Sequence, residues 1–214
     1  MPAASFDQST YQVRLEWGTA GLARLAPADI VVIVDVLRFS SRIVKALEGE
    51  AEYPLDDAAR ELSPTGVEIA LLAAEQTSSI ILLGALTNAS AVADAVLAEQ
   101  ARRGARTSVA IIAAGDRDSS RLDGDTRFAV EDFLGAGAII DALAAGGIDH
   151  TSPEAAAAGE SFAALRRALR HLLAASGSGR ELLDHGATAE VVDAAALNTS
   201  TIVPVLTNGV FRAL

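Results

Sequence analysis

The chain has 214 residues, half of them hydrophobic, which is enough for one large domain. At this length a compact fold buries roughly 70% of the surface that the unfolded chain exposes. The formal net charge is −11, from 17 basic and 28 acidic residues, and this sign disfavours binding to nucleic acid or to an anionic membrane surface. Cysteine is absent, which excludes disulfides, thiol catalysis and cysteine-ligated metal. No basic segment followed by an apolar run opens the sequence, and no apolar run is long enough to span a bilayer, so we expect a cytoplasmic protein.

Short apolar runs alternate with helical patterns along the chain. Residues 11–17 alternate in polarity, as in a half-exposed strand, whereas three unbroken apolar runs predict strands buried on both faces, at 30–36, 79–83 and 108–114. Helical patterns cover 22–25, the segment from Ser40 or Ser41 to Glu48, 66–75, 89–103, 130–143, 152–175 and 180–185. Breaks or loops are expected at 18–21, 55–63, 116–125 and 177–179, and terminal strands at 191–195 and 202–206. This order predicts one domain over residues 1–214, with a three-layer α/β/α architecture and a largely parallel central sheet.

Ligands of open α/β sheets bind outside the carboxyl ends of the strands, and the first polar cluster expected there is Asp35 with Arg38. Asp35 closes a buried strand, and Arg38 follows three residues later. A carboxylate in this position can hold a metal ion, and a guanidinium can bind an anion through paired donors. An Asp–Arg ion pair that caps the turn explains the pattern equally well.

Two further clusters follow the next two buried strands. Thr87, Asn88 and Ser90 lie at the expected start of a helix, where free N–H groups can bind an anion or Asn88 can act as an ordinary cap. Gly115 follows the third strand and precedes an acidic loop, whose aspartates we expect to be solvated: Asp118, Asp123 and Asp125.

The fourth cluster is Glu131-Asp132, which opens a helix containing Gly135 and Gly137. Acidic residues suit the first turn of a helix without any further role. Adjacent helical positions point about 100° apart, so we expect at most one of the two to face a shared site. If that residue meets Asp35, a Mg²⁺ ion bound through few carboxylates and substrate oxygens can occupy the site.

In this order, the clusters resemble the 2-phosphosulfolactate phosphatases, the ComB family of coenzyme M biosynthesis. The matching segments span nearly the whole chain: LEWG at 15–18, VVIVDVLRFSSRIVKAL at 31–47, LLGALTNASAVA at 82–93, AAG at 113–115, VEDFLGAGAII at 130–140, SGSGRELLDHG at 176–186 and VP at 203–204.

The resemblance implies a ComB-like α/β/α fold and a Mg²⁺-dependent phosphatase that releases phosphate from a small phosphorylated sulfonate or hydroxy acid. Carried over residue by residue, the matched polar positions are Asp35, Arg38, Asn88, Glu131 and Asp132. From the chemistry of their side chains we assign catalysis to Asp35, Arg38 and Glu131, and metal binding to Asp35, Glu131 and Asp132. Substrate binding is assigned to Arg38, Asn88, Ser90 and Gly115. We also expect a homodimer.

The sequence departs from the family between the first helix and the second buried strand. The family has a longer loop there, followed by an NGT or NGS turn, whereas this chain has only residues 55–67 and the turn LSPTGV. An alternative function follows from this difference, namely an inactive or re-purposed paralogue that binds a small anion without turnover. A third interpretation, an oligomerisation module, rests on the Gly/Ala-rich face of residues 131–140.

Overall fold

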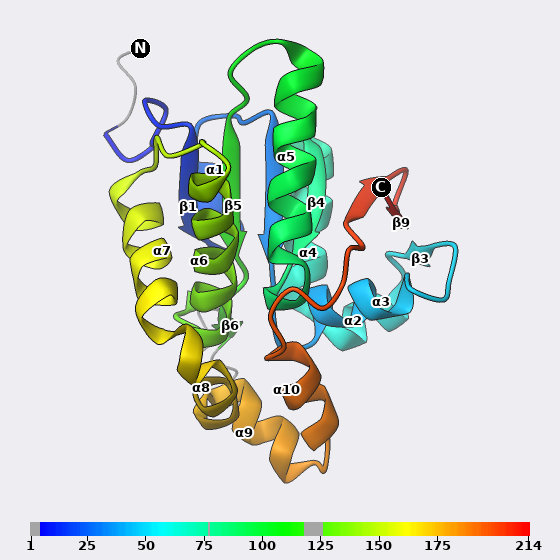
Figure 1. The fold of residues 1–214 in the computed structure, drawn as a ribbon. Coiled ribbons are helices and arrows are strands. Elements are labelled where there is room, and N and C mark those ends of the chain that lie inside the picture. Colours follow the sequence, from blue (N-terminus) through cyan, green and yellow to red (C-terminus); the bar gives the residue numbers. More distant parts are fainter. Residues whose placement is uncertain (1–4, 77, 118–125) are drawn as a thin grey trace.

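The computed structural model describes residues 5–76, 78–117 and 126–214, and a seven-stranded mixed sheet lies at its centre (Figure 1). The strand order is β1-β5-β2-β4-β8-β9-β3. The strands of this sheet are β1 (Val13–Trp17), β2 (Ile30–Val34), β3 (Tyr53–Pro54), β4 (Ile80–Gly84), β5 (Val109–Ala113), β8 (Pro204–Thr207) and β9 (Val210–Ala213). A two-residue hairpin, β6 (Asp116–Arg117) with β7 (Thr126–Arg127), follows β5.

The four strands β1, β5, β2 and β4 run parallel, and the three strands beyond β4 pair antiparallel. All five residues of β2 are buried, as expected for a β-branched run in the middle of a covered parallel sheet. Its residue Val32 is in register with Leu82 of β4 and Ile111 of β5. The predicted α/β/α architecture with a largely parallel sheet is therefore confirmed.

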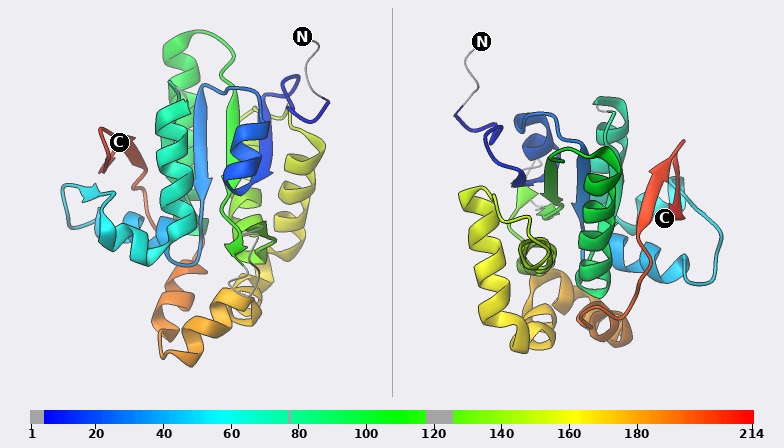
Figure 2. Two further views of the ribbon diagram at one scale, coloured as in Figure 1. Left: turned by 180° about the vertical axis from the view of Figure 1, so that it is seen from behind. Right: turned by 45° about the horizontal axis from the view of Figure 1, so that its top comes forward.

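Helices cover both faces of the sheet (Figure 2). Side chains from α1 (Gly18–Arg24), α2 (Phe39–Ala46), α3 (Asp57–Leu62) and α4 (Pro64–Gln76) pack in one hydrophobic cluster with one face of the strands. Side chains from α5 (Ala89–Arg103), α6 (Val130–Ala145) and α7 (Pro153–Leu165) pack in a second cluster on the opposite face. The chain then passes beneath the carboxyl ends of the strands through α8 (Leu169–Ala175), α9 (Gly177–Asp184) and α10 (Thr188–Ala194).

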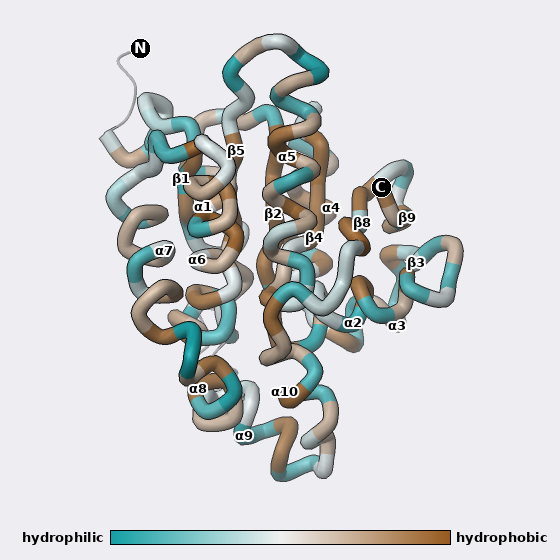
Figure 3. The backbone as a smooth tube through the Cα atoms, in the orientation of Figure 1, coloured by the Kyte–Doolittle hydropathy of each residue, from teal (hydrophilic) through white to brown (hydrophobic). Residues whose placement is uncertain are grey.

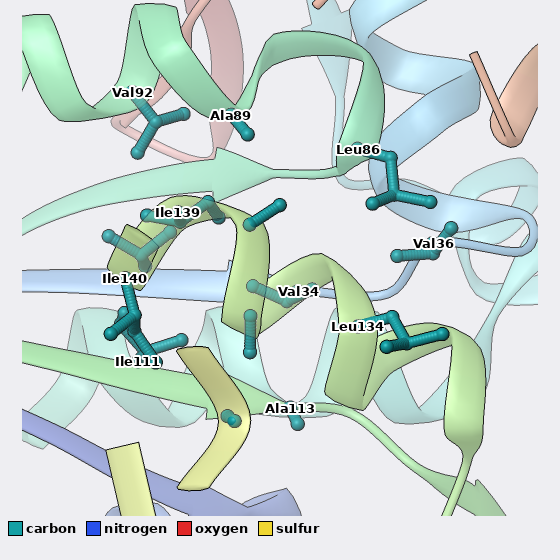
Figure 4. Close-up of a cluster of buried hydrophobic side chains, with 14 of the residues drawn as sticks. Val34, Val36, Leu86, Ala89, Val92, Ile111, Ala113, Leu134, Ile139 and Ile140 are labelled. Atoms are coloured by element: carbon teal, nitrogen blue, oxygen red, sulfur yellow. The ribbon is translucent and has the colours of Figure 1, made fainter. Parts of the chain in front are cut away.

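The hydropathy of the chain follows this layering, because the apolar residues concentrate along the strands and on the helix faces turned toward them (Figure 3). On the α6 face, Val34 and Val36 pack with Leu134 and Ile139 (Figure 4). Gly135 permits this close approach, since a Cβ atom there would lie 2.5 Å from Val36. A Cβ atom on Gly137 would lie 2.2 Å from the backbone oxygen of Ala158 in α7. The Gly/Ala face of α6 is thus used for packing within the chain, which removes the basis of the oligomerisation interpretation.

The expected break at 18–21 forms the first part of α1 and is therefore wrong. Four other local predictions are also wrong. Residues 191–195 belong to α10 and not to a strand, because Val191 and Ala194 are buried at helical spacing. The expected loop 55–63 contains α3, which Asp56 caps by accepting a hydrogen bond from the Ala59 amide. The expected break at 177–179 is the first turn of α9, capped by Ser176.

The first strand, predicted to be half exposed, is the fourth correction. Gln12 and Arg14 are buried, because their side chains find backbone partners inside the fold. The guanidinium of Arg14 donates hydrogen bonds to the carbonyl oxygens of Tyr11 and Ala26. Within the described ranges, no helix is long and apolar enough to cross a membrane.

Candidate functional site

The chain leaves the sheet in opposite directions at the ends of β2 and of its two neighbours, β4 and β5. After β2 the chain continues into α2, which packs with the face covered by α1 and α4. After the neighbouring strands β4 and β5 it continues into α5 and α6, on the opposite face. Such changes of direction between adjacent parallel strands are the places where α/β sheets bind ligands. We refer to the crevice at the ends of β2 and β5 as the β2/β5 crevice.

Asp35, the residue after β2, is buried in this crevice with 7% of its surface exposed. Its Oδ2 atom accepts a hydrogen bond of 2.7 Å from the Ser63 hydroxyl. Burial raises the pKa of Asp35 to about 6, the hydrogen bond from Ser63 opposes the rise, and the nearby charges of Glu131 and Asp116 add to it. Asp35 is thus ionised at neutral pH but able to take up a proton.

Asp132, on the first turn of α6, joins the ends of the two strands. Its Oδ1 accepts a 2.7 Å hydrogen bond from the Val36 amide, and its Oδ2 accepts a 2.9 Å hydrogen bond from the Gly115 amide. Burial raises the pKa of Asp132 well above its ordinary value, the charges of Asp35 and Glu131 raise it further, and the two amides oppose the rise. Asp132 and Asp35 therefore influence each other's titration.

Glu131 lies beside this pair and differs from it in having no partner. The residue is 2% exposed and raises the pKa of both Asp35 and Asp132 by its charge. In the part of the chain that the structure describes, its carboxylate takes part in no hydrogen bond or ion pair. Both acidic residues of the helix start thus lie near Asp35, although the sequence predicted at most one. Of these two, Asp132 has both oxygens engaged, whereas Glu131 has no partner among the described residues.

The carboxylates at this place can be compared with the ligands of the Mg²⁺ ion that the family resemblance implies. No three histidine or acidic side chains among the described residues form a group that could hold a metal ion. Mg²⁺ is commonly held by one or two carboxylates together with water and substrate oxygens. Asp35 and Glu131 fit this arrangement, whereas both oxygens of Asp132 already accept amide hydrogens.

Arg38 occupies the N-cap position of α2 in an unusual backbone conformation, with φ of 109° and ψ of −73°. Non-glycine residues rarely adopt positive φ, and such conformations concentrate at functional sites. Its Nη2 atom lies 3.0 Å from Glu181 Oε2 of α9. Among the described residues, Arg38 has no ion pair with Asp35, so the alternative of an Asp–Arg pair capping the turn is not observed. The predicted cap of α2 by Ser40 or Ser41 is also wrong, because the Ser40 hydroxyl binds the backbone at Ile33 and Asp35.

The cluster at the start of α5 has a structural role. Asn88 is fully buried, its Oδ1 accepts a hydrogen bond from the Ala85 amide, and its Nδ2 donates to the carbonyl oxygens of Leu83 and Ile202. The amide of Ser90 donates to Asn198 Oδ1, so that a side chain from the C-terminal segment occupies the helix start. These contacts leave Asn88 no group for a ligand, and they replace the substrate-binding assignment of Asn88 and of the Ser90 amide.

Gly115 is likewise engaged, since its amide is the donor to Asp132 and its φ of +69° suits the turn after β5. Its assignment to substrate binding is therefore also replaced by a structural role. Asp116, the next residue, accepts hydrogen bonds from the Ser178 hydroxyl of α9 and from the guanidinium of Arg127. The predicted solvated aspartates of the loop lie outside the described residues.

Three contacts of the crevice were missed in the sequence, namely those made by Ser63, Ser178 and Glu181. Ser63 belongs to the shortened turn LSPTGV, where its hydroxyl donates to Asp35 and accepts from the Gly66 amide. Ser178 and Glu181 lie in the segment SGSGRELLDHG, which resembles the family but carries no recognisable ligand spacing. The shortened turn therefore still provides a hydroxyl group to the site.

The comparison with known families agrees with this geometry. A family model described as 2-phosphosulpholactate phosphatase matches residues 62–209, more than half of the chain. The chain belongs to this family. No curated protein matches the sequence significantly. The matched residues include Ser63, Glu131, Asp132 and Glu181, and the same crevice receives Asp35 and Arg38 from the segment that precedes the match.

Proposed function

We propose that this member of a phosphatase family is a Mg²⁺-dependent phosphomonoesterase acting on a small phosphorylated hydroxy acid or sulfonate, of which 2-phosphosulfolactate is the first to test. The observation that carries the proposal is the pair of buried carboxylates, Asp35 and Glu131, at the carboxyl ends of β2 and β5, with Arg38 three residues after Asp35 in the turn that opens α2. Membership of the family supports the reaction class.

Arg38 is the residue proposed to bind the phosphate. Its side chain is one-third exposed, and its partner Glu181 is 59% exposed. An exposed ion pair of this kind contributes only about 0–1 kcal/mol. A phosphate dianion, which can accept two parallel hydrogen bonds from a guanidinium, is therefore able to displace Glu181.

Asp35 is proposed to accept the proton of the attacking water. Hydrolysis forms a bond between the water oxygen and phosphorus, breaks the ester P–O bond, and requires a proton to leave the water and a proton to reach the alkoxide. Because the pKa of Asp35 is raised to about 6, its carboxylate can take the first proton near neutral pH and return it to the leaving alcohol. The Ser63 hydroxyl orients the carboxylate for this step.

A Mg²⁺ ion, when bound, would neutralise charge on the phosphate oxygens. Glu131 would hold it together with water and substrate oxygens, because its carboxylate accepts no hydrogen bond and forms no ion pair in the described residues, which leaves Asp35 free to act as the base. Asp132 would remain a positioning residue, since it fixes the backbone at Val36 and Gly115.

The proposal is tested by measuring phosphate released from racemic 2-phosphosulfolactate, with Mg²⁺, with EDTA, and with EDTA followed by excess Mg²⁺. We expect release that EDTA abolishes and Mg²⁺ restores. Release no faster than that of an Asp35→Ala variant refutes hydrolysis at this site, and EDTA-insensitive release refutes the metal assignment. Calorimetric binding of phosphate or sulfolactate without turnover would instead support the non-catalytic paralogue.

A further inference from the structure

A second cavity lies on the other side of β2, at the ends of β2 and β4, and we call it the β2/β4 cavity. Its volume is about 460 Å³. Its walls are formed by the residues after β2, the basic side of α2, Thr87 of η1 (Leu86–Asn88), the inner side of α10 and the irregular segment around Ser200. Val36 and Arg38, which follow Asp35 in the chain, line it as well.

Hydrogen bonds fix one wall of this cavity, and one of them is made by Asn88, which the sequence assigned to substrate binding. The amide of Ser200 donates to the Thr87 carbonyl oxygen, and the amide of Asn198 donates to that of Leu86. Asn88 connects the same turn to Ile202. The turn after β4 and the C-terminal segment thus form one fixed wall.

Thr87 carries an unpartnered polar group in this wall. The residue is 8% exposed, and its Oγ1 atom is the buried side-chain oxygen that finds no hydrogen-bond partner among the described residues. An unsatisfied buried hydroxyl costs about 1–3 kcal/mol. A ligand that offers a hydrogen-bonding group beside Thr87 recovers part of this cost, whereas a valine at this position would avoid it altogether.

Two basic residues that line the cavity, Arg42 and Lys45, form ion pairs that are exposed to solvent. Arg42 lies 3.9 Å from Glu190, and Lys45 lies 2.6 Å from Asp193 in α10. More than half of each basic side chain is exposed, and exposed pairs of this kind contribute about 0–1 kcal/mol. An anionic group entering from solvent can therefore compete with these two carboxylates.

We propose that the β2/β4 cavity receives the organic part of the substrate, and that the substrate is a phosphorylated acid whose body is longer than three carbons and ends in a second anionic group. The proposal rests on the proposed function, in which Arg38 holds the phosphate between the two spaces. Arg42 and Lys45 bind the second anion, and the Thr87 hydroxyl bonds to the body of the ligand. At about 460 Å³ the cavity has more room than a three-carbon acid fills.

A matched pair of probes tests the proposal by calorimetry in the presence of Mg²⁺. 3-Phosphoglycerate and 6-phosphogluconate both carry a phosphate at one end and a carboxylate at the other, and they differ in the length of the carbon chain. Each is titrated into the wild type and into Thr87→Val, Arg42→Gln and Arg102→Gln. Arg102 is an exposed residue of α5 paired with Glu99, and its variant serves as the control.

We expect the longer probe to bind the wild type at least about tenfold more tightly than the shorter one. Thr87→Val and Arg42→Gln should each weaken the longer probe about tenfold and the shorter probe less than twofold, as the loss of one hydrogen bond or charge contact predicts. Arg102→Gln should change neither. Equal affinities for the two probes, or affinities that neither cavity variant changes, overturn the proposal.

Phosphate release from 2-phosphosulfolactate, measured on the same preparations, separates this inference from the proposed function. Release by the wild type without any preference for the longer probe refutes only the inference. A variant-sensitive preference for the longer probe without release from any substrate refutes the hydrolase proposal and leaves the binding site intact. Thr87→Val should also raise the melting temperature, so loss of folding will not mimic loss of binding.

Discussion

Replacing Arg38 by glycine should make the protein more stable while it removes activity. The residue holds φ of 109° and ψ of −73°, a conformation that costs a non-glycine residue about 1–3 kcal/mol. Glycine relieves this cost, but its greater freedom in the unfolded chain opposes folding by about 0.5–1 kcal/mol. The lost ion pair with Glu181 is exposed and costs about 0–1 kcal/mol more.

From the middle of these ranges, the net gain in the free energy of unfolding is about 1 kcal/mol. For a chain of this length such a gain raises the melting temperature by roughly 2–4 °C. Replacement of Arg38 by lysine retains the strained backbone and the charge, so we expect its stability to change by less than about 0.5 kcal/mol. Lysine lacks the planar paired donors, and kcat/KM should fall about ten- to a hundredfold.

Stability is measured by urea unfolding and differential scanning fluorimetry, and kcat/KM by steady-state phosphate release. Each measurement is made on the wild type, Arg38→Lys and Arg38→Gly. A melting temperature that falls by several degrees in Arg38→Gly would show that the backbone at this position is not strained. Unchanged kcat/KM in Arg38→Lys would remove Arg38 from the phosphate site.

Three further predictions concern other parts of the molecule. Because the pKa of Asp35 is raised to about 6 in the folded protein, its stabilising contribution is fully present below the unfolded value near 3.9 and is lost as the pH rises through 6. Asp35→Asn should therefore gain about 2 kcal/mol relative to the wild type between pH 4 and pH 7 in urea unfolding, and a pH-independent difference contradicts the assignment. Asn88→Ala should lower the free energy of unfolding by about 2–4 kcal/mol, because it leaves buried backbone groups without partners. At a temperature where both proteins are folded, the inhibition constant of inorganic phosphate should be the same for the variant and the wild type. Weaker inhibition of the variant would show that Asn88 binds the ligand. Gly137→Ala should lower the free energy of unfolding by about 1–3 kcal/mol, because the added methyl group separates α6 from α7. In size-exclusion chromatography the variant should keep the oligomeric state of the wild type. Dissociation of the variant without loss of stability would contradict the role of Gly137 in packing within the chain.

Much of the fold could be predicted because the sequence carries strong local signals. The run of five buried residues in β2 has no polar position, which identifies a central parallel strand in a covered sheet. The segment around Val191 was ambiguous, since a short apolar run fits a strand as well as one side of a helix. Its helical form depends on burial against α8 and α9, which no local pattern encodes.

The candidate site could be predicted only where it depends on the ends of parallel strands. Asp35 and the acidic start of α6 meet because β2 and β5 are neighbours, and the sequence indicated only that both lie at the carboxyl ends of buried strands. The pairing of Arg38 with Glu181 joins residues 143 positions apart and could not be found from spacing. Asn88 has the sequence pattern of a ligand-binding helix start, yet its partners at Leu83 and Ile202 use all of its hydrogen-bonding groups.

The central claim is that Asp35 and Glu131 together hydrolyse a phosphomonoester. The most direct measurement compares kcat/KM for phosphate release from 2-phosphosulfolactate, with Mg²⁺, in the wild type, Asp35→Asn, Glu131→Gln and the control Arg102→Gln. We predict that each carboxamide variant loses at least about a hundredfold, as expected for a general base or a metal ligand, while Arg102→Gln keeps the wild-type value. Wild-type activity in both Asp35→Asn and Glu131→Gln would contradict the account.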